Sequence, residues 1–282
     1  RGEKASPWEG ITIWYLAYPM KRGVREMVDR SVATIRRSHL MRLAREGKRL
    51  DGRDPDQMRR AEIATGVISD YDGSARIRLG GTELIVGVHI EKGRPYPNLP
   101  ESGTMHTKLQ LHPIASPRLG KEDTDLEATE ISRVIDRGIR NSGAVDLGEL
   151  CITPGEEAWT LFVDLLVLDF DGNLFDASHL GILKVLKETK FPASDNGTGD
   201  EFPVLVKGLP VSTTFVKMGD SIFLDPTALE ERVADARISM VCDEAGNIRS
   251  IQKGGRGGFT ASDIKEVFRH ARETSDRLRK GL

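Results

Sequence analysis

The sequence predicts an α+β fold, in which mixed or antiparallel sheets pack on a few helices. Strand-like segments outnumber helical ones, and several neighbouring strands are joined by hairpin turns rather than by crossover helices. Acidic turns also recur after strands, at Asp70–Ser74, Asp169–Asn173 and Asp243–Asn247. This recurrence favours two similar halves within the 282 residues, a length that can bury one large core or two small ones.

Composition excludes several classes of protein. The net charge of −2 rules out a polycation, so a nucleic-acid surface would have to be a local patch. The two cysteines are far apart and the six histidines form no metal-ligand motif, so we expect no disulfide, no metal and no cofactor. No apolar run approaches the roughly 20 residues of a membrane span, so we expect no membrane partner, and the sparse cysteines favour a protein of the reducing cytoplasm.

The first part of the chain divides into an extension and the start of the fold. We assign residues 1–26 to an N-terminal extension of unknown role and residues 27–282 to one domain. An apolar stripe predicts a helix over Met27–Glu46, ended by Gly47. After a polar turn at Arg49–Pro55, alternation and turn residues predict three strands, at Glu62–Ser69, Ser74–Leu79 and Thr82–Ile90.

A proline-containing loop, Gly93–Gly103, separates these strands from the next pair of elements. Met105–Ile114 is predicted to be a strand. A long helix is predicted over Asp125–Asn141, because acidic and hydroxyl residues precede it and Gly143 follows it.

The centre of the chain combines a buried strand, a sharp turn and a packed helix. Leu150–Thr153 and the branched, apolar Trp159–Leu168 are predicted strands, and leucines at helical spacing predict a helix from Leu174 to Lys190. A surface loop at Ser194–Asp200 follows. The remaining predictions are strands around Val204–Val206, Val211–Lys217, Ile238–Cys242 and Ile248–Gln252, a turn at Gly254–Gly258, and a terminal helix from Thr260 or Ser262.

One motif favours an enzyme. Asp169 and Asp171 resemble the nucleophile and general acid of haloacid-dehalogenase-type phosphatases, and Asp220 with Asp225 resembles that family's last Mg²⁺-binding motif. However, Asn173 replaces that family's Thr, mostly strands follow, and the same acidic turn occurs twice elsewhere. We therefore interpret the motif as a scaffold turn, and keep a Mg²⁺-dependent phosphatase as the alternative function.

The long helix carries a basic face. Arg133, Arg137 and Arg140 lie at i, i+4 and i+7, so their guanidinium groups share one side. The planar fork of arginine suits phosphates, and three in a row suit a polyanion. The other interpretation is a solvated face that Glu130 and Asp136 neutralise.

Several motifs in order resemble the RNase PH family, and more narrowly its non-catalytic members in the archaeal exosome. The resemblance covers roughly residue 49 to the C-terminus. Its carriers are Leu50–Arg53, Asp72–Ala75, Gly93–Pro97, Glu130–Arg140, Asn141–Pro154, the strand-turn-helix at 159–192, and Gln252-Lys253.

The resemblance implies a fold of two pseudo-equivalent βαβα halves and a place in a ring that degrades RNA from its 3′ end with inorganic phosphate. The implied partners are a catalytic RNase-PH-like paralogue in a heterohexamer (a trimer of heterodimers), RNA-binding cap subunits, and single-stranded RNA. A structural subunit without RNA contacts is a further alternative.

The resemblance also implies that this chain has no catalytic residue. Active relatives have adjacent arginines where this chain has Leu126 and Glu127. They bind phosphate with a Gly-Ser-Arg turn, whereas Gly172 here precedes Asn173-Leu174, and they carry an acid that Gly208–Pro210 lacks. Phosphorolysis needs a cationic pocket and an acid, so we expect an inactive subunit.

The implied RNA-binding residues are Arg133 and Arg137, with Arg140 one turn further on. Arg256 lies in a glycine-rich turn, where we expect a connection between elements rather than a binding site. Asp51-Gly52-Arg53 is expected to be a turn with an internal ion pair.

Overall fold

The computed structural model describes residues 37–112, 114–115, 121–191, 202–204 and 206–282, and only the backbone of 121–127 and 202. Residues 40–282 form one compact unit, and residues 1–39 belong to another. Part of the predicted first helix, residues 27–36, lies outside the described residues, and so does the predicted loop at 194–200. Within the larger unit, the end of that first helix reaches residue 45.

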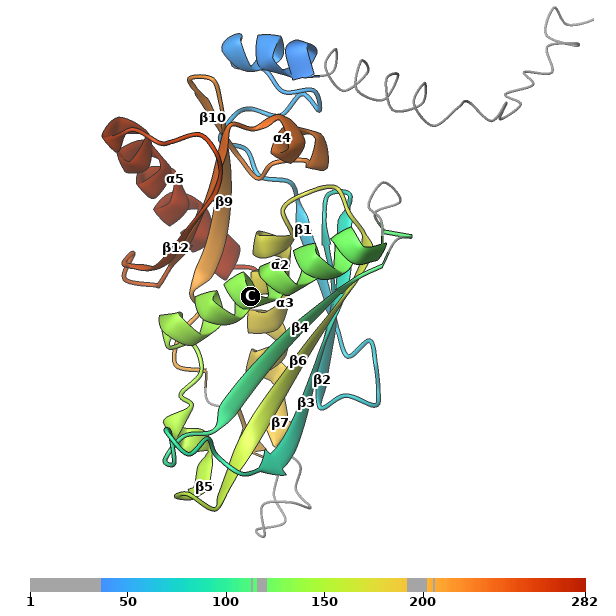
Figure 1. Ribbon diagram of the computed structural model, residues 1–282, viewed down its shortest axis with the longest axis vertical. Coiled ribbons are helices and arrows are strands. Elements are labelled where there is room, and N and C mark those ends of the chain that lie inside the picture. The colour runs from blue at the N-terminus through green and yellow to red at the C-terminus, as the bar shows by residue number, and fades with distance from the viewer. Residues whose placement is uncertain (1–36, 113, 116–120, 192–201, 205) are drawn as a thin grey trace, which may run out of the picture. The chain divides into compact units, whose positions relative to one another are not determined.

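The first half of the unit is built on a six-stranded sheet (Figure 1). Its order is β1 (Ala61–Thr65), β2 (Gly73–Leu79), β3 (Thr82–Gly93), β6 (Glu157–Asp169) and β4 (Thr104–Leu111), and β5 (Cys151–Thr153) also pairs with β6. The β4–β6 pair is parallel and the other pairs are antiparallel. The predicted strands and the hairpin before β2 are thereby confirmed, within a few residues at their ends.

Two long helices accompany this sheet. α2 (Lys121–Ser142) packs on β4 and also contacts β12 of the second half, while α3 (Leu174–Glu188) packs on β2, β3 and β9. The predicted start of α2 at Asp125 is wrong by four residues. Asp123 and Asp125, the acidic residues that suggested this start, are the third and fifth residues of the helix. A short 3₁₀ turn, Gly148–Leu150, leads into β5.

The second half is a four-stranded antiparallel sheet of order β10-β9-β11-β12, with two helices (Figure 1). These elements are β9 (Val211–Met218), β10 (Ser221–Leu224), α4 (Ala228–Val233), β11 (Ala236–Cys242), β12 (Ile248–Gly255) and α5 (Ala261–Arg279). A small pair, β7 (Lys190–Phe191) and β8 (Phe202–Pro203), connects the halves.

The structure corrects several predictions in this region. The helix expected to reach Lys190 ends at Glu188, because Lys190 already belongs to β7. The first two residues of the expected Gly254–Gly258 turn continue β12. The strand expected at 204–206 is reduced to a single bridge between Val206 and Val145, with residue 205 outside the described residues.

The α+β class is confirmed, with mixed pairing confined to the first sheet. The acidic turns are turns in both halves, and Asp72 and Asp243 each accept backbone hydrogen bonds. Among the described residues, no helix is long and apolar enough to cross a membrane.

Candidate functional site

The exposed face of α2 forms an open groove against β4. Arg133, Arg137 and Arg140 line it together with Asp136, and the groove encloses about 410 Å³. The helix is held in place from behind, because Ile131, Ile135 and Ile139 are buried in the core of the first half. Ser132 pins the helix to the strand: its hydroxyl accepts from the Leu109 amide at 2.8 Å and donates to the Ala128 carbonyl at 2.7 Å.

The three arginines differ in what they contact. Arg140 donates to the Met105 carbonyl at 2.7 Å and pairs with Asp136 at 3.0 Å. The Thr107 hydroxyl donates to the same Asp136 carboxylate at 3.2 Å. Within the described part of the chain, Arg133 and Arg137 are exposed and have no polar partner. The groove therefore presents two free guanidinium groups beside a third that is already engaged.

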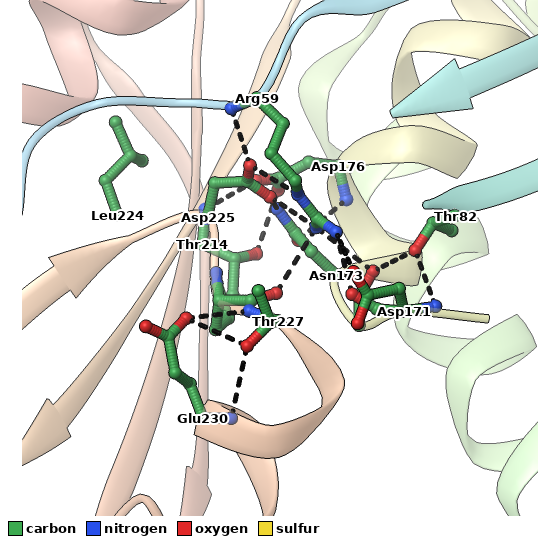
Figure 2. Close-up of polar contacts among 12 residues, drawn as sticks. Arg59, Thr82, Asp171, Asn173, Asp176, Thr214, Leu224, Asp225, Thr227 and Glu230 are labelled. Atoms are coloured by element: carbon green, nitrogen blue, oxygen red, sulfur yellow. Dashed lines mark hydrogen bonds and ion pairs between the residues drawn. The ribbon is translucent and has the colours of Figure 1, made fainter. Parts of the chain in front are cut away.

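A second polar cluster lies where α3 begins, and here almost every charge is paired (Figure 2). Arg59 donates to both Asp225 oxygens at 2.8 Å and to the Asp171 carbonyl at 2.7 Å. Asn173, in the left-handed region with φ of 58°, donates its side-chain amide to Asp225 at 2.6 Å and to Asp176 at 2.8 Å. We call Arg59, Asn173, Asp176 and Asp225 the buried node.

Asp176 is fully buried in the first turn of α3. Its carboxylate accepts from the Ser212 hydroxyl and from the Thr214 amide and hydroxyl, all at 2.8 Å. Burial raises the pKa of Asp176 to about 6, against the opposing effect of the hydrogen bonds from Asn173, Thr214 and Ser212. The positive end of the α3 dipole thus already faces a carboxylate of the protein itself.

Asp225 behaves differently because its neighbours are cationic. Burial raises the pKa of this carboxyl, but the hydrogen bonds from Arg59 and Asn173 and the charge of Arg59 together outweigh burial and hold the pKa below its usual value. Arg53 adds a contact at 3.0 Å, and the Asn173 backbone amide is taken by Glu231 at 3.0 Å. Three carboxylates therefore occupy the surroundings of the α3 N-terminus.

The other residues singled out from the sequence lie outside both the groove and the buried node, or have no described side chain. The Asp51–Arg53 ion pair is confirmed at 2.7 Å. Arg256 follows β12 and is exposed. The side chains of Leu126 and Glu127 lie outside the described residues. In Gly208–Pro210, the Leu209 amide donates to Glu244 and its carbonyl accepts from Arg279 at 2.8 Å.

Among the four carboxylates of the phosphatase motif, Asp171 and Asp225 both contact Arg59, whereas Asp169 and Asp220 are exposed. Asp169 accepts from the Phe170 amide at 2.8 Å, whereas Asp171 faces Arg59 at 3.4 Å. Asp220 is exposed and Asp225 belongs to the buried node. Across the described residues, no group of three acidic, histidine or cysteine side chains is arranged to hold a metal ion.

Sequence reasoning missed the residues that link distant parts of the chain. Arg59 and Asp225 are 166 positions apart, so no local spacing could indicate their contact. It also missed a row of aromatic rings beside the groove, formed by Tyr96, His106 and Phe162. Two features of the sequence could have indicated this row: the proline residues on both sides of Tyr96, and the alternation of side chains along β4 and β6.

Residues 57–192 match the model of the 3′ exoribonuclease family, domain 1, and residues 208–274 match domain 2 of that family. The chain is 41% identical to exosome complex component Rrp42 of Methanocella arvoryzae, over 91% of this chain and 98% of the relative. It is 43% identical to Rrp42 of Thermococcus gammatolerans, over 89% and 95%.

A solved structure agrees with these sequence matches. A chain of the Archaeoglobus fulgidus exosome, described as having RNA bound to the active site, superposes with a TM-score of 0.84 at 36% identity. The match covers 89% of this chain and 98% of that one.

Proposed function

This chain belongs to the 3′ exoribonuclease (RNase PH) family, and from that premise we propose that it is a catalytically inactive, RNA-binding subunit of an archaeal exosome. The proposed assembly is a ring in which this chain alternates with a catalytic RNase-PH-like paralogue, as a trimer of heterodimers with RNA-binding cap subunits. We place it in the cytoplasm, with residues 27–282 as the RNase-PH-like domain and residues 1–26 as an extension. Because the chain belongs to this family, we no longer retain the Mg²⁺-dependent phosphatase as an alternative function.

The single observation that carries the RNA-binding role is that Arg133 and Arg137 on α2 have no hydrogen-bond or ion-pair partner among the described residues. Buried isoleucines and Ser132 hold this helix rigidly, so the side chains of Arg133 and Arg137 project from a fixed frame. Exposed arginines on a rigid helix can bind successive phosphates without first breaking internal ion pairs. Arg140 is bound to the Met105 carbonyl and to Asp136, which it holds against the groove wall. It therefore supports the site and is not its main RNA-binding residue.

Catalytic inactivity is supported by what occupies the start of α3. A phosphorolytic site must hold a free phosphate dianion next to cationic or amide donors. Here Asn173, at the start of α3, gives its backbone amide to Glu231 and its side-chain amide to Asp176 and Asp225, so a phosphate would meet three carboxylates. Leu174 is buried and supplies no charge at the first helical position.

The test of inactivity is phosphate-dependent degradation of oligo(A) by this chain alone, by the catalytic paralogue alone, and by the two mixed. We expect no activity from this chain and an increase on mixing. Phosphate-dependent degradation by the purified chain would contradict inactivity. Equal activity of the paralogue with and without this chain would contradict the supporting role.

The test of RNA binding is the salt dependence of affinity for single-stranded RNA. Changing both Arg133→Ala and Arg137→Ala should lower the slope of log K against log salt by about 1.4, since each phosphate contact contributes about 0.7. The matched control is Arg232→Ala with Lys265→Ala, which removes two exposed positive charges from α4 and α5. An equal change in both double variants would mean that only net charge matters.

A further inference from the structure

A row of three aromatic rings borders the arginine groove. The His106 ring stacks on Phe162 with centroids 5.5 Å apart and planes 24° from parallel. Tyr96 meets His106 in an edge-to-face arrangement at 6.4 Å, and 48% of Tyr96 is exposed. His106 also lines the arginine groove, so the row and the groove share one wall.

The backbone fixes this row. His106 on β4 and Phe162 on β6 are register partners in the parallel pair, so their side chains lie on the same face of the sheet. Tyr96 stands in the loop after β3, between Pro95 and Pro97, whose rings restrict the backbone. The Tyr96 carbonyl accepts from the Leu99 amide at 2.9 Å, which closes a turn. The rings are held in place before any ligand arrives.

The charges on the two sides of the row are opposite. On the α2 side, Asp136 is held by Arg140 and Thr107, so the free groups are cationic. On the other side, Phe162 borders a pocket of about 430 Å³ whose carboxylates are Asp70, Glu91 and Asp164. A polyanion is attracted to the first side and repelled from the second. The row of rings lies between the two sides, and the less polar groups of the bound polyanion can cover it.

We propose that Tyr96 and His106 form a base-stacking subsite for an unpaired nucleobase of single-stranded RNA whose phosphates bind Arg133 and Arg137. This subsite rests on the proposed function. Stacking on aromatic rings needs no particular base, because every base has a π face. The subsite would therefore add affinity without sequence preference, and it would distinguish an RNA strand from a bare polyanion.

The test compares two RNAs of equal length and charge bound by the full chain: oligo(A), and the same backbone with abasic residues. Tyr96→Ala should weaken oligo(A) binding about five-fold or more, in the range of stacking losses on alanine substitution. Binding of the abasic strand should change less than two-fold, and the salt slope should stay constant. His106→Ala should show the same pattern.

Two control variants distinguish an effect of the Tyr96 ring on affinity from an effect of the surrounding loop. Tyr96→Phe keeps the ring and should retain oligo(A) affinity, while Leu99→Ala truncates another exposed side chain of the same loop and should also be neutral. Equal losses for oligo(A) and the abasic strand, or no loss for either, would overturn the subsite. If the Arg133 and Arg137 changes lower the salt slope but Tyr96→Ala has no effect on affinity, the stacking subsite is overturned and the proposed RNA binding is not. Failure of the unaltered chain to bind RNA would overturn the proposed RNA binding with it.

Discussion

The exposed face of α2 and the start of α3 use the same kinds of side chain for opposite purposes. At α3, Arg59 is nearly buried and each of its donor nitrogens has an acceptor within the protein. On α2, Arg133 and Arg137 are exposed and keep their donors free within the described part of the chain. Paired charges stabilise the junction of the two halves, whereas unpaired ones remain available for a ligand. The number of arginines alone would not distinguish the two regions.

The largest expected effect comes from breaking the buried node. Arg59→Ala leaves the Asp225 carboxylate buried and without its main partner, which should cost about 3–5 kcal/mol of unfolding free energy. Chemical denaturation measures this loss. The neighbouring Arg60→Ala is the control, since that side chain is 86% exposed and should change stability by less than about 0.5 kcal/mol. Similar stabilities for the two variants would show that the node does not hold the halves together.

The next effect depends on pH. Asp176 ionises near pH 3.8 in the unfolded chain and near pH 6 in the folded protein. Between these values the folded state binds more protons, so this group's contribution to stability is present at low pH and falls as pH rises through the window. The fall is on the order of 3 kcal/mol. Asp176→Asn removes it, so the stability difference, unaltered chain minus variant, should decrease between about pH 4 and pH 6. A difference independent of pH would contradict the assignment.

A smaller effect is expected where α2 crosses α3. A methyl group added at Gly138 would lie 2.4 Å from Nε2 of His179, a buried ring whose pKa burial lowers to about 4. Gly138→Ala should therefore cost about 1–3 kcal/mol through overpacking, although alanine normally favours a helix. His179→Ala should relieve part of that cost in the double variant, measured as a non-additive coupling. Strict additivity would mean that the two residues do not meet.

The smallest effect on stability belongs to the groove itself. Arg133→Ala should leave the unfolding free energy within about 0.5 kcal/mol, because the exposed side chain has no hydrogen bond or ion pair to lose among the described residues. It should still lower the salt slope of RNA binding by about 0.7. Arg140→Ala should show the reverse balance: a loss of about 1 kcal/mol, from its hydrogen bond to Met105, and a weaker effect on the slope. Identical behaviour of the two variants would remove the distinction between binding and supporting arginines.

Local patterns predicted the elements that are long and periodic. The spacing of Arg133, Arg137 and Arg140 sufficed to place them on one face, because the period of a helix is fixed by its geometry. The Asp51–Arg53 ion pair was predictable because its partners are two residues apart. The short β10 and α4 were missed, since four and six residues carry too little periodic signal.

The buried node was not predictable in the same way. Asp225 was considered only as a member of a metal motif, and its positive φ and its pairing with Arg59 depend on where the chain brings three separate segments. Spacing also could not reveal that Arg140 is engaged while Arg133 and Arg137 have no polar partner among the described residues. That difference follows from the Met105 carbonyl on β4, which the sequence of α2 does not contain.

The contact between Arg59 and Asp225 has a consequence for biosynthesis. Their separation of 166 residues means that a ribosome adding about 5–20 residues per second incorporates the arginine roughly 10–30 s before the aspartate. Throughout that interval Arg59 lacks Asp225, its main counter-ion, at the surface where the second half will dock, and has only the longer contact with Asp171. The first half should therefore complete its folding only late in translation, and a chain released before Asp225 should be a preferred substrate for chaperones.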